Sequence, residues 1–330
     1  MNAIAKYVFI ILSFFSICSC CMTRSKTTEF LPGKIAVNRN DSMYIYDNSN
    51  IISARFKIKG EEFEYSGFKW SNKEGGLIGI QYFNSVRKGT TRSSIVHFNI
   101  LGQIGETIYE SKEGEIAGHA YLSKNDNNLL FTIDKIGNSN VDELEGLNRE
   151  KNVLLFDYKH KILSRKIENI GTSLNFDLRE SPWLIDEHRF IFTISADKQL
   201  TIDSSTINLI KKDSLGIYIY DLKTNLKKLL VQNASFGICS PTNLSIAYIK
   251  DQSIKVLNLE ENSTRIIYAV TPKDRIINIH WTPDGKCIYI AYYKNSVDGY
   301  EREEKLIQVK DIKEKLFMKT GHGFQSYTWQ

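Results

Sequence analysis

The stretch that decides the fold lies near the C-terminus and reads Ile279-His280-Trp281-Thr282-Pro283-Asp284-Gly285-Lys286-Cys287-Ile288-Tyr289-Ile290-Ala291-Tyr292. A short apolar segment precedes residues 282–286, and a stronger apolar segment follows them. Pro fixes φ and Gly accepts a positive φ, so the middle of the stretch favours a tight turn. The stretch therefore predicts two antiparallel strands joined by a short turn.

The same order of elements recurs along the chain. Two clear copies are Phe68-Lys69-Trp70-Ser71-Asn72 before residues 77–83, and Cys239-Ser240-Pro241-Thr242-Asn243 before residues 244–249. Two fainter copies are Leu122-Ser123-Lys124-Asn125-Asp126 before residues 129–133, and Glu180-Ser181-Pro182 before residues 190–194. Internal repeats of this kind are typical of arrays of similar structural units.

A second repeated element is an alternating strand that ends in Asp or Asn. It occurs as Tyr44-Ile45-Tyr46-Asp47, Val96-His97-Phe98-Asn99, Leu154-Leu155-Phe156-Asp157, Tyr218-Ile219-Tyr220-Asp221, Lys255-Val256-Leu257-Asn258 and Gln308-Val309-Lys310-Asp311. An Asx side chain suits a strand end because it accepts a hydrogen bond from the backbone two residues on. A further short strand follows each copy, as in residues 227–231.

Together these elements predict repeats of about 50 residues, each a four-stranded antiparallel sheet with strands A to D. Residues 33–330 show no convincing helical periodicity. Such a sheet cannot bury both faces alone, so we expect six sheets to stack around an axis as a six-bladed β-propeller. Residues 324–330 resemble a lone A strand, and residues 34–58 supply the other three strands of that blade. A pair of β-sandwiches is the alternative.

The segment Trp281-Thr282-Pro283-Asp284-Gly285-Lys286 resembles the W-S-P-D-G-K repeat of TolB-like propellers, which also occurs in the propellers of prolyl oligopeptidases. The resemblance extends through the repeats over residues 34–330, although this one copy is the close match. It implies the propeller fold and says little about activity. The hydrolases of that group carry a separate catalytic domain, and we expect none in these 330 residues.

The N-terminus predicts export and a lipid anchor. Lys6 precedes an apolar run over residues 7–17, which is the length of a signal-peptide core and short for a membrane span. The run ends in Ile17-Cys18-Ser19-Cys20, which resembles the lipobox of bacterial lipoproteins. The resemblance implies a signal peptide over residues 1–19, acylation of Cys20 and a tether over residues 20–33. Acylation of Cys21 and a simple secretory signal are the alternatives.

We therefore expect the protein to be a membrane-anchored lipoprotein that faces the periplasm. Arg24 and Lys26 follow the cysteines without an acidic run, which argues against a surface-export tag. The sequence leaves open whether the inner or the outer membrane holds the anchor.

Composition narrows the class of partner. The 43 Lys and Arg residues exceed the 38 Asp and Glu residues by five, and the two signs are mixed along the chain. A nucleic-acid-binding protein would gather its basic residues in one stripe, so we expect no nucleic-acid partner. Cys239 and Cys287 lie in apolar strand patterns, and we expect both to be buried free thiols. We expect a monomer.

Known catalytic and cofactor motifs are absent from the 330 residues. There is no G-x-S-x-G, no HExxH, no two C-x-x-C pairs, no P-loop and no dinucleotide fingerprint. We therefore expect no cofactor and no metal, and we favour a binding protein over an enzyme. His97 is placed in a strand, and His160 and His188 are placed in turns.

Four residues fall at or just before A strands, where a propeller opens its central channel: His119, Asp177, Arg275 and His322. Two histidines and a carboxylate there could bind a metal or a substrate. Asn278 is the amide placed nearest to them. The alternative is that these polar groups only line a hydrated channel.

Four B-to-C connections look long, over residues 84–92, 135–151, 195–214 and 294–303, whereas the A-to-B turns are short. Long insertions on one face of a repeat array mark the binding face. Arg87 and Lys88 lie in the first of these loops, against Asp142 and Glu143 in the second. Such a rim predicts a non-enzymatic interaction module for an envelope protein or peptide. The alternative is a small-molecule or glycan site in the channel, which could be catalytic.

Overall fold

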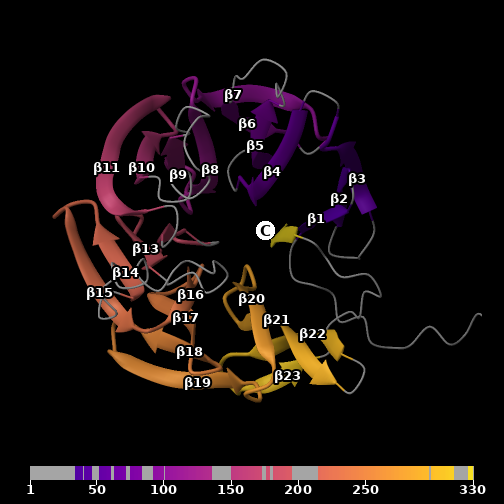
Figure 1. Ribbon diagram of the computed structural model, residues 1–330, viewed down its shortest axis with the longest axis vertical. Coiled ribbons are helices and arrows are strands. Elements are labelled where there is room, and N and C mark those ends of the chain that lie inside the picture. The colour runs from indigo at the N-terminus through magenta and orange to yellow at the C-terminus, as the bar shows by residue number, and fades with distance from the viewer. Residues whose placement is uncertain are drawn as a thin grey trace, which may run out of the picture.

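The computed structural model describes residues 34–39, 41–46, 52–60, 63–71, 75–83, 92–99, 101–135, 150–172, 176–178, 181–194, 215–296, 299–315 and 326–329. These residues form strands and turns, arranged as sheets around a centre (Figure 1). No helix in these ranges is long and apolar enough to cross a membrane.

The first three sheets follow one another in the chain. The first comprises β4 (Phe63–Trp70), β5 (Leu77–Phe83), β6 (Ser93–Phe98) and β7 (Ile104–Glu110). The second comprises β8 (Glu115–Leu122), β9 (Asn128–Lys135), β10 (Glu150–Asp157) and β11 (Ile162–Thr172). The third comprises β12 (Phe176–Asp177), β13 (Arg189–Ile194), β14 (Gly216–Asp221) and β15 (Leu226–Gln232).

The remaining sheets include one that joins both ends of the chain. The fourth comprises β16 (Ser235–Cys239), β17 (Ser245–Lys250), β18 (Ser253–Asn258) and β19 (Ser263–Ala269). The fifth comprises β20 (Arg275–Trp281), β21 (Cys287–Ser296), β22 (Gly299–Gln308) and β23 (Lys313–Lys315). The sixth places β24 (Ser326–Trp329) beside β1 (Ile35–Arg39), β2 (Ser42–Tyr46) and β3 (Ile52–Lys57).

The predicted all-β propeller with four-stranded antiparallel blades is confirmed. In each sheet the A strand comes nearest to the centre and the D strand lies outermost (Figure 1). In the sixth sheet β24 is antiparallel to β1, with Trp329 opposite Ile35 and Ser326 opposite Asn38. The first and last described strands therefore share one sheet, as the sequence predicts.

The A-to-B turn repeats in atomic detail. The amide of Thr282 donates to the carbonyl of Cys287 at 2.9 Å, and the amide of Ser240 donates to the carbonyl of Ser245 at 2.8 Å. In the third sheet the equivalent residue is Leu184, whose amide donates to the carbonyl of Arg189 at 3.0 Å. The prediction that the third sheet's turn begins at Ser181-Pro182 was therefore wrong: the turn begins three residues later, at Leu184. The indole of Trp183 takes the place of Trp281 there, since bulk at the strand end matters more to packing than the Ser-Pro pair.

The predicted Asx turns are confirmed at three strand ends. The side-chain oxygens of Asn99, Asp221 and Asn258 accept hydrogen bonds from the backbone amides two residues on, at 2.9, 2.8 and 2.9 Å. The prediction fails in the fifth sheet, where β22 ends at Gln308 instead of Asp311. Asp311 accepts instead from the side-chain amide of Gln308, at 3.3 Å.

Successive sheets bury their faces against each other. Leu130 and Val153 of the second sheet share a cluster with Phe190 and Phe192 of the third. Similar clusters join the sixth sheet to the first, the first to the second, the third to the fourth and the fourth to the fifth. On its other face the fifth sheet carries a smaller cluster built around Tyr289. Cys239 and Cys287 are buried free thiols, as expected.

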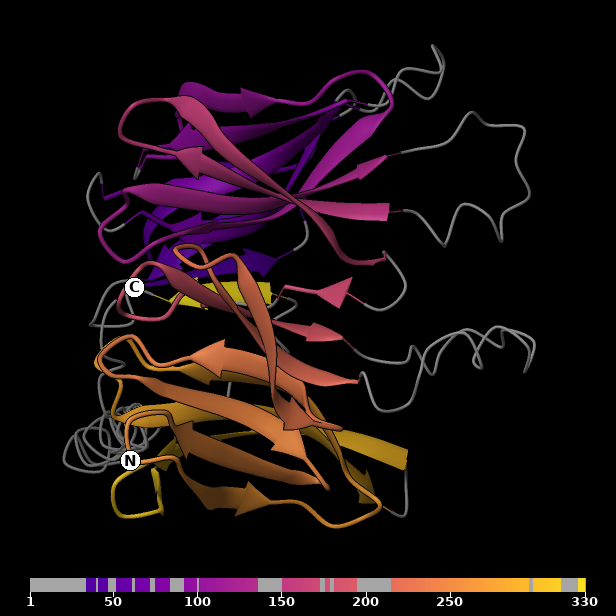
Figure 2. The same ribbon diagram turned by 90° about the vertical axis from the view of Figure 1, so that its left-hand side faces the viewer.

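One predicted loop is a pair of strands. The sequence predicts a long loop over residues 294–303, but β21 runs to Ser296 and β22 begins at Gly299. Lys294 lies opposite Glu301, and Asn295 lies opposite Tyr300. The polar composition suggested a loop, and cross-strand pairs of charged and aromatic side chains stabilise strands there instead. The hairpin projects beyond the sheets on the B-to-C side (Figure 2).

The other three predicted long loops, over residues 84–92, 135–151 and 195–214, fall almost entirely outside the described residues. The binding-face prediction that rested on their length therefore stays a prediction.

Deleting residues 324–330 should destabilise the protein, because β24 pairs with β1 next to Ala36 and Ile45, which are fully buried. We expect a lower melting temperature and a broadened transition in circular dichroism and calorimetry. Removing Gln330 alone is the control and should leave melting unchanged. A truncated protein that melts like its parent would show that β24 contributes no stability.

Candidate functional site

The A strands enclose a cavity of about 340 Å³ at the centre of the sheets, which we call the channel cavity. Its walls come from the four A strands β4, β8, β16 and β20. Ile80 and Tyr82 of β5, Asp134 of β9 and Leu178 after β12 complete them. The walls are mixed in character: Lys69, Asp134 and Asn278 are polar, and Ile238 is apolar. A cavity of this size is suited to a small molecule.

Each of these four A strands bulges where it borders the cavity. The pairing register shifts between Ser66 and Lys69 in β4, between Gly118 and Tyr121 in β8, between Ser235 and Ile238 in β16, and between Ile276 and Asn278 in β20. A bulge leaves backbone unpaired in the ladder and redirects side chains. Ser66 and Gly67, Gly118, Phe236 and Asn278, which lie at these bulges, line the cavity.

Backbone geometry at two bulges is unusual. Gly67 has φ of 63°, and the equivalent residue of β16, Phe236, has φ of 55°. A left-handed conformation favours glycine and is strained for a bulky residue. Both residues line the channel cavity, so the strain lies where the cavity is formed.

Polar groups in the channel are held by specific contacts. The Lys69 ammonium lies 5.2 Å from the centre of the Tyr121 ring, and the Tyr121 hydroxyl donates to the carbonyl of Leu178 at 2.8 Å. The side-chain amide of Asn278 contacts Nε2 of His280 at 2.8 Å. The cavity thus offers a cation, a carboxylate at Asp134 and an amide, which together can bind hydroxyl and carboxylate groups.

Burial raises the pKa of Tyr82, which also lines the channel cavity. A hydrogen bond with Ser66 acts in the opposite direction, and the Asp134 carboxylate raises the pKa further. Tyr82 therefore stays a neutral phenol in the physiological range and can donate a hydrogen bond.

The channel residues predicted from sequence divide into three groups. Asn278 lines the cavity, as expected. The backbone of His119 lies in the β8 bulge, at the position equivalent to Gly67 and Phe236. Its side chain is not among the described parts of the structure. Asp177 in β12 is half-buried, and Arg275, at the start of β20, is exposed.

The other predicted positions, His322, Arg87, Lys88 and Cys20, lie outside the described residues. Their roles stay predictions.

Sequence reasoning missed Lys69 and Asp134. Lys69 stands directly before the repeat tryptophan Trp70, at the position equivalent to His280. Aligning the repeats by that tryptophan would have placed Lys69 on an A strand beside the channel. Asp134 gave no such signal, because it sits at the end of an ordinary B strand.

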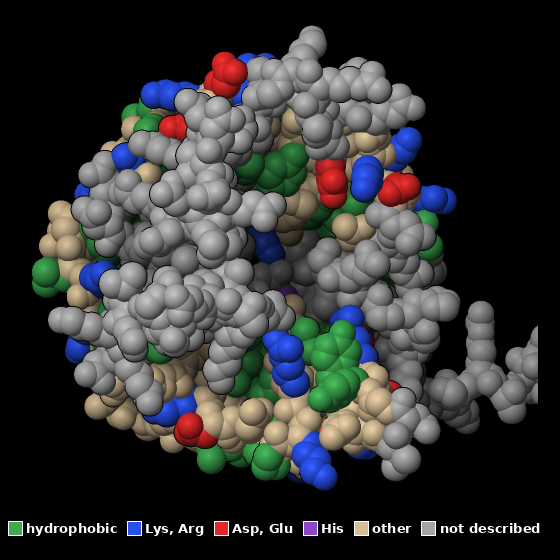
Figure 3. All heavy atoms as spheres, viewed as in Figure 1, with side chains coloured by type: hydrophobic (Ala, Val, Ile, Leu, Met, Phe, Trp, Pro, Cys, Tyr) green, Lys and Arg blue, Asp and Glu red, His purple; other side chains and the backbone are tan. Residues whose placement is uncertain are grey.

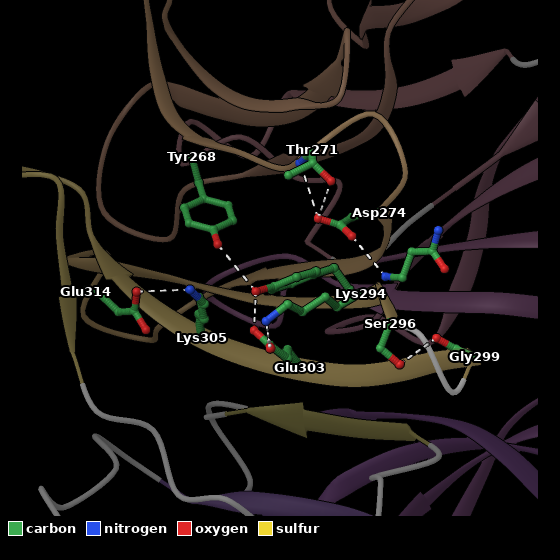
Figure 4. A network of polar contacts seen from close by, with 11 residues as sticks. Tyr268, Thr271, Asp274, Lys294, Ser296, Gly299, Glu303, Lys305 and Glu314 are labelled. Carbon is green, nitrogen blue, oxygen red and sulfur yellow. Dashed lines mark hydrogen bonds and ion pairs between the residues drawn. The ribbon is translucent and has the colours of Figure 1, made fainter.

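A second polar group lies where the fourth and fifth sheets meet (Figure 4). The buried Tyr292 hydroxyl donates a short hydrogen bond to one Glu303 carboxylate oxygen, and the Lys294 ammonium donates to the other at 3.0 Å. The Tyr268 hydroxyl lies 3.5 Å from that of Tyr292, and the Lys305 ammonium lies 5.3 Å from the centre of the Tyr268 ring. These contacts brace the base of the β21–β22 hairpin.

The same contacts shift the pKa values of the group. The hydrogen bond from Tyr292, followed by that from Lys294, holds the pKa of Glu303 below its ordinary value. Burial, and then the contact with Glu303, raises the pKa of Tyr292. Glu303 is therefore ionised and Tyr292 neutral at physiological pH. Tyr293 and Tyr300 project from this braced base, with ring centres 6.3 Å apart and 40% and 71% of their surfaces exposed.

The B-to-C face is hollowed at its centre, where Lys or Arg side chains and a His side chain are visible (Figure 3). Among the described residues, no group of three His, Cys, Asp or Glu side chains is close enough to hold a metal ion.

Comparisons with known proteins agree on the fold. Two oligogalacturonate lyases match 83% of this chain: one from Vibrio parahaemolyticus (TM-score 0.57, 11% identity, 70% of that chain) and one in complex with manganese (TM-score 0.56, 9% identity, 69% of that chain). The fold is a β-propeller. A prolyl endopeptidase matches 84% of this chain with a TM-score of 0.50 and 10% identity, over 37% of its own length.

At these identities the likeness concerns the fold alone. No family model and no curated protein matches the sequence, so the TolB-like resemblance stays an expectation.

Proposed function

We propose that this propeller binds a small acidic sugar or a similar hydroxyl-rich carboxylate in the channel cavity. The observation that carries the proposal is the convergence of four bulged A strands on a cavity of about 340 Å³ that holds Lys69, Asp134 and Asn278. Pockets of this kind, with a few convergent polar groups, are the usual place for a small ligand.

The chemistry of the walls selects the class of ligand. The Lys69 ammonium would pair with a carboxylate, and the Asp134 carboxylate would accept hydrogen bonds from hydroxyl groups. Tyr82 and Asn278 add a neutral donor and an amide. Structurally similar proteins include oligogalacturonate lyases, which makes digalacturonate a suitable first probe.

Replacing Lys69 by Met should weaken digalacturonate binding about tenfold, because the variant keeps the length of the side chain and removes its charge. Titration calorimetry measures the dissociation constant, with galactose as the uncharged comparison. Lys228→Met, at an exposed position of the outer strand β15, is the matched control and should bind as the parent does. Binding that is unchanged in Lys69→Met, or no binding by the parent, would contradict the proposal.

A second candidate function is an interaction module for an envelope protein or peptide. It is favoured by the projecting β21–β22 hairpin, which carries the exposed Tyr293 and Tyr300 on a braced base. Exposed tyrosines on a rigid support are typical of interface anchors.

Replacing Tyr293 and Tyr300 together by Ser should abolish capture of a specific envelope partner from detergent-solubilised membranes, without lowering the melting temperature. Leu101→Ser with Leu226→Ser is the control. Both leucines are 66% exposed; Leu101 lies in a C-to-D turn and Leu226 directly follows one, on the opposite face. A partner lost equally in both double variants would argue against the hairpin.

We further propose that the six sheets close into a ring and that a lipid on Cys20 holds it at a membrane, facing the periplasm. The pairing of β24 with β1 supports closure, and so does the burial of the Tyr289 cluster on the face of the fifth sheet that is turned away from the fourth. The chain enters β1 at the A-to-B side, since Ile35 pairs with Trp329 at the end of an A strand. An anchor there would leave the B-to-C face turned toward a partner.

Cys20→Ala should remove fatty-acid labelling and release the protein from membranes, because several acyl chains hold a protein far better than none. Labelling with a clickable fatty acid, followed by fractionation, measures both effects. Cys21→Ala is the control and should stay labelled. Loss of label in Cys21→Ala alone would move the acylated residue by one position.

A further inference from the structure

An exposed aliphatic side chain recurs at one position of the sheets, where the outermost strand begins after the C-to-D turn. The first residues of β3, β7, β11 and β15 are Ile52, Ile104, Ile162 and Leu226. In the fifth sheet Ile312 directly precedes β23. Between 48% and 66% of the surface of each of these residues is exposed. We call the five residues the aliphatic rim.

The aliphatic rim lies on one face of the molecule. Successive strands of each sheet are antiparallel, so the C-to-D turns lie on the same face as the A-to-B turns. The β21–β22 hairpin projects from the opposite face (Figure 2). Exposed apolar residues that are scattered singly are common on soluble proteins, whereas a repeated set on one face indicates a contact surface.

The fourth sheet interrupts the rim. There β19 begins with Ser263, and the exposed residues Glu260 and Glu261 stand in the turn before it. The other five sheets follow one another around the centre, and the fourth sheet lies across the centre from the first (Figure 1). The rim therefore forms an arc whose middle is the first sheet, with the acidic turn on the far side.

Two turns of the arc are basic. Residues 157–165 and 221–228, beside the rim in the second and third sheets, contain six Lys and Arg residues and two Asp residues. Both Asp side chains accept hydrogen bonds within their own turns. Glu106 of the first sheet contacts Lys161 and offsets one further charge, so the excess stays positive. Aliphatic side chains beside an excess of lysine suit an anionic lipid surface, because the apolar groups enter the acyl boundary while the ammonium groups stay at the phosphates.

The chain reaches this face at the sixth sheet, within the arc. Its strand β1 begins at Ile35, opposite Trp329 at the end of an A strand. Residues 20–33 would connect an acylated Cys20 to β1, and they span at most about 50 Å when fully extended. A lipid on Cys20 would therefore keep the face that carries the rim within reach of the bilayer.

We propose that the aliphatic rim docks on a bilayer that contains anionic lipids, with its Ile and Leu side chains in the acyl boundary and the lysines of the second and third sheets at lipid phosphates. The proposal rests in part on the lipid proposed for Cys20, which supplies proximity but not the contact itself. Docking holds the propeller flat on the membrane and directs the β21–β22 hairpin away from it.

The test places the photo-crosslinker p-benzoylphenylalanine at Thr224 of the full-length chain, an exposed position in the C-to-D turn of the third sheet. The protein is reconstituted in vesicles of phosphatidylcholine and phosphatidylglycerol, and mass spectrometry measures lipid adducts. We expect about tenfold more adduct at Thr224 than at Glu301, the matched exposed position on the opposite face. Vesicles of phosphatidylcholine alone should give about threefold less adduct at Thr224, because the lysines lose their anionic partners.

A double variant of the rim tests the apolar contact. Ile104→Ser with Ile162→Ser should lower the adduct yield at Thr224 about tenfold, because both side chains would leave the acyl boundary. The melting temperature should stay unchanged, since both residues are exposed. Ile266→Ser is the control, because Ile266 is 55% exposed within β19 and lies outside the rim.

Equal yields at Thr224 and Glu301, or a yield at Thr224 that survives the double variant, would overturn the proposal. Fatty-acid labelling of the same samples reports the anchor separately. Labelled protein without the Thr224 adduct overturns the docking alone, unlabelled protein with the adduct overturns the anchor alone, and unlabelled protein without it overturns both. A rim that captures a membrane protein but gives no lipid adduct in protein-free vesicles is a protein interface, which also overturns the proposal.

Discussion

Each four-stranded sheet of this chain has two apolar faces, and neither can be buried within the sheet itself. In β9, for example, Leu130 packs toward the third sheet, whereas Leu129 and Phe131 pack toward the first. Neighbouring sheets must therefore lie face to face, and their innermost strands must converge on a centre. The repeated A-to-B turn and the tryptophans at the A-strand ends set the spacing of that convergence. The rest of the structure depends on this mutual burial.

Convergence has a consequence for the inner strands. A regular strand would direct alternate side chains into the two neighbouring sheets and leave nothing for the centre. The bulges in β4, β8, β16 and β20 release residues from that alternation, and Gly67, Gly118 and Phe236 among them line the channel cavity. A second cavity, of about 400 Å³, lies at the A-to-B ends of the inner strands, with Pro241 and Pro283 in its lining. Two cavities, each with polar and apolar walls, therefore lie along the inner strands.

The candidate sites were only partly accessible from the sequence. Asn278 was placed near the channel because it lies on a strand next to the clearest repeat, and the structure confirms it. Lys69 and Asp134 were not recognised, because a bulge cannot be located from the alternation of residue types. Residues 294–303 were taken for a loop, because the strands there are stabilised by cross-strand pairs such as Tyr292 with Glu303, which a single strand does not reveal.

The sequence by itself determined the type of fold: its repeated strand, turn and Asx patterns are local, and local backbone preferences suffice to specify four-stranded units. It also determined that the last strand pairs with the first, because an A strand was missing at one end and left over at the other. Only the tertiary structure decided which residues face the cavities. That choice depends on bulges and on contacts between sheets far apart in the chain, such as Trp183 with Tyr121, and these form only when the sheets are packed.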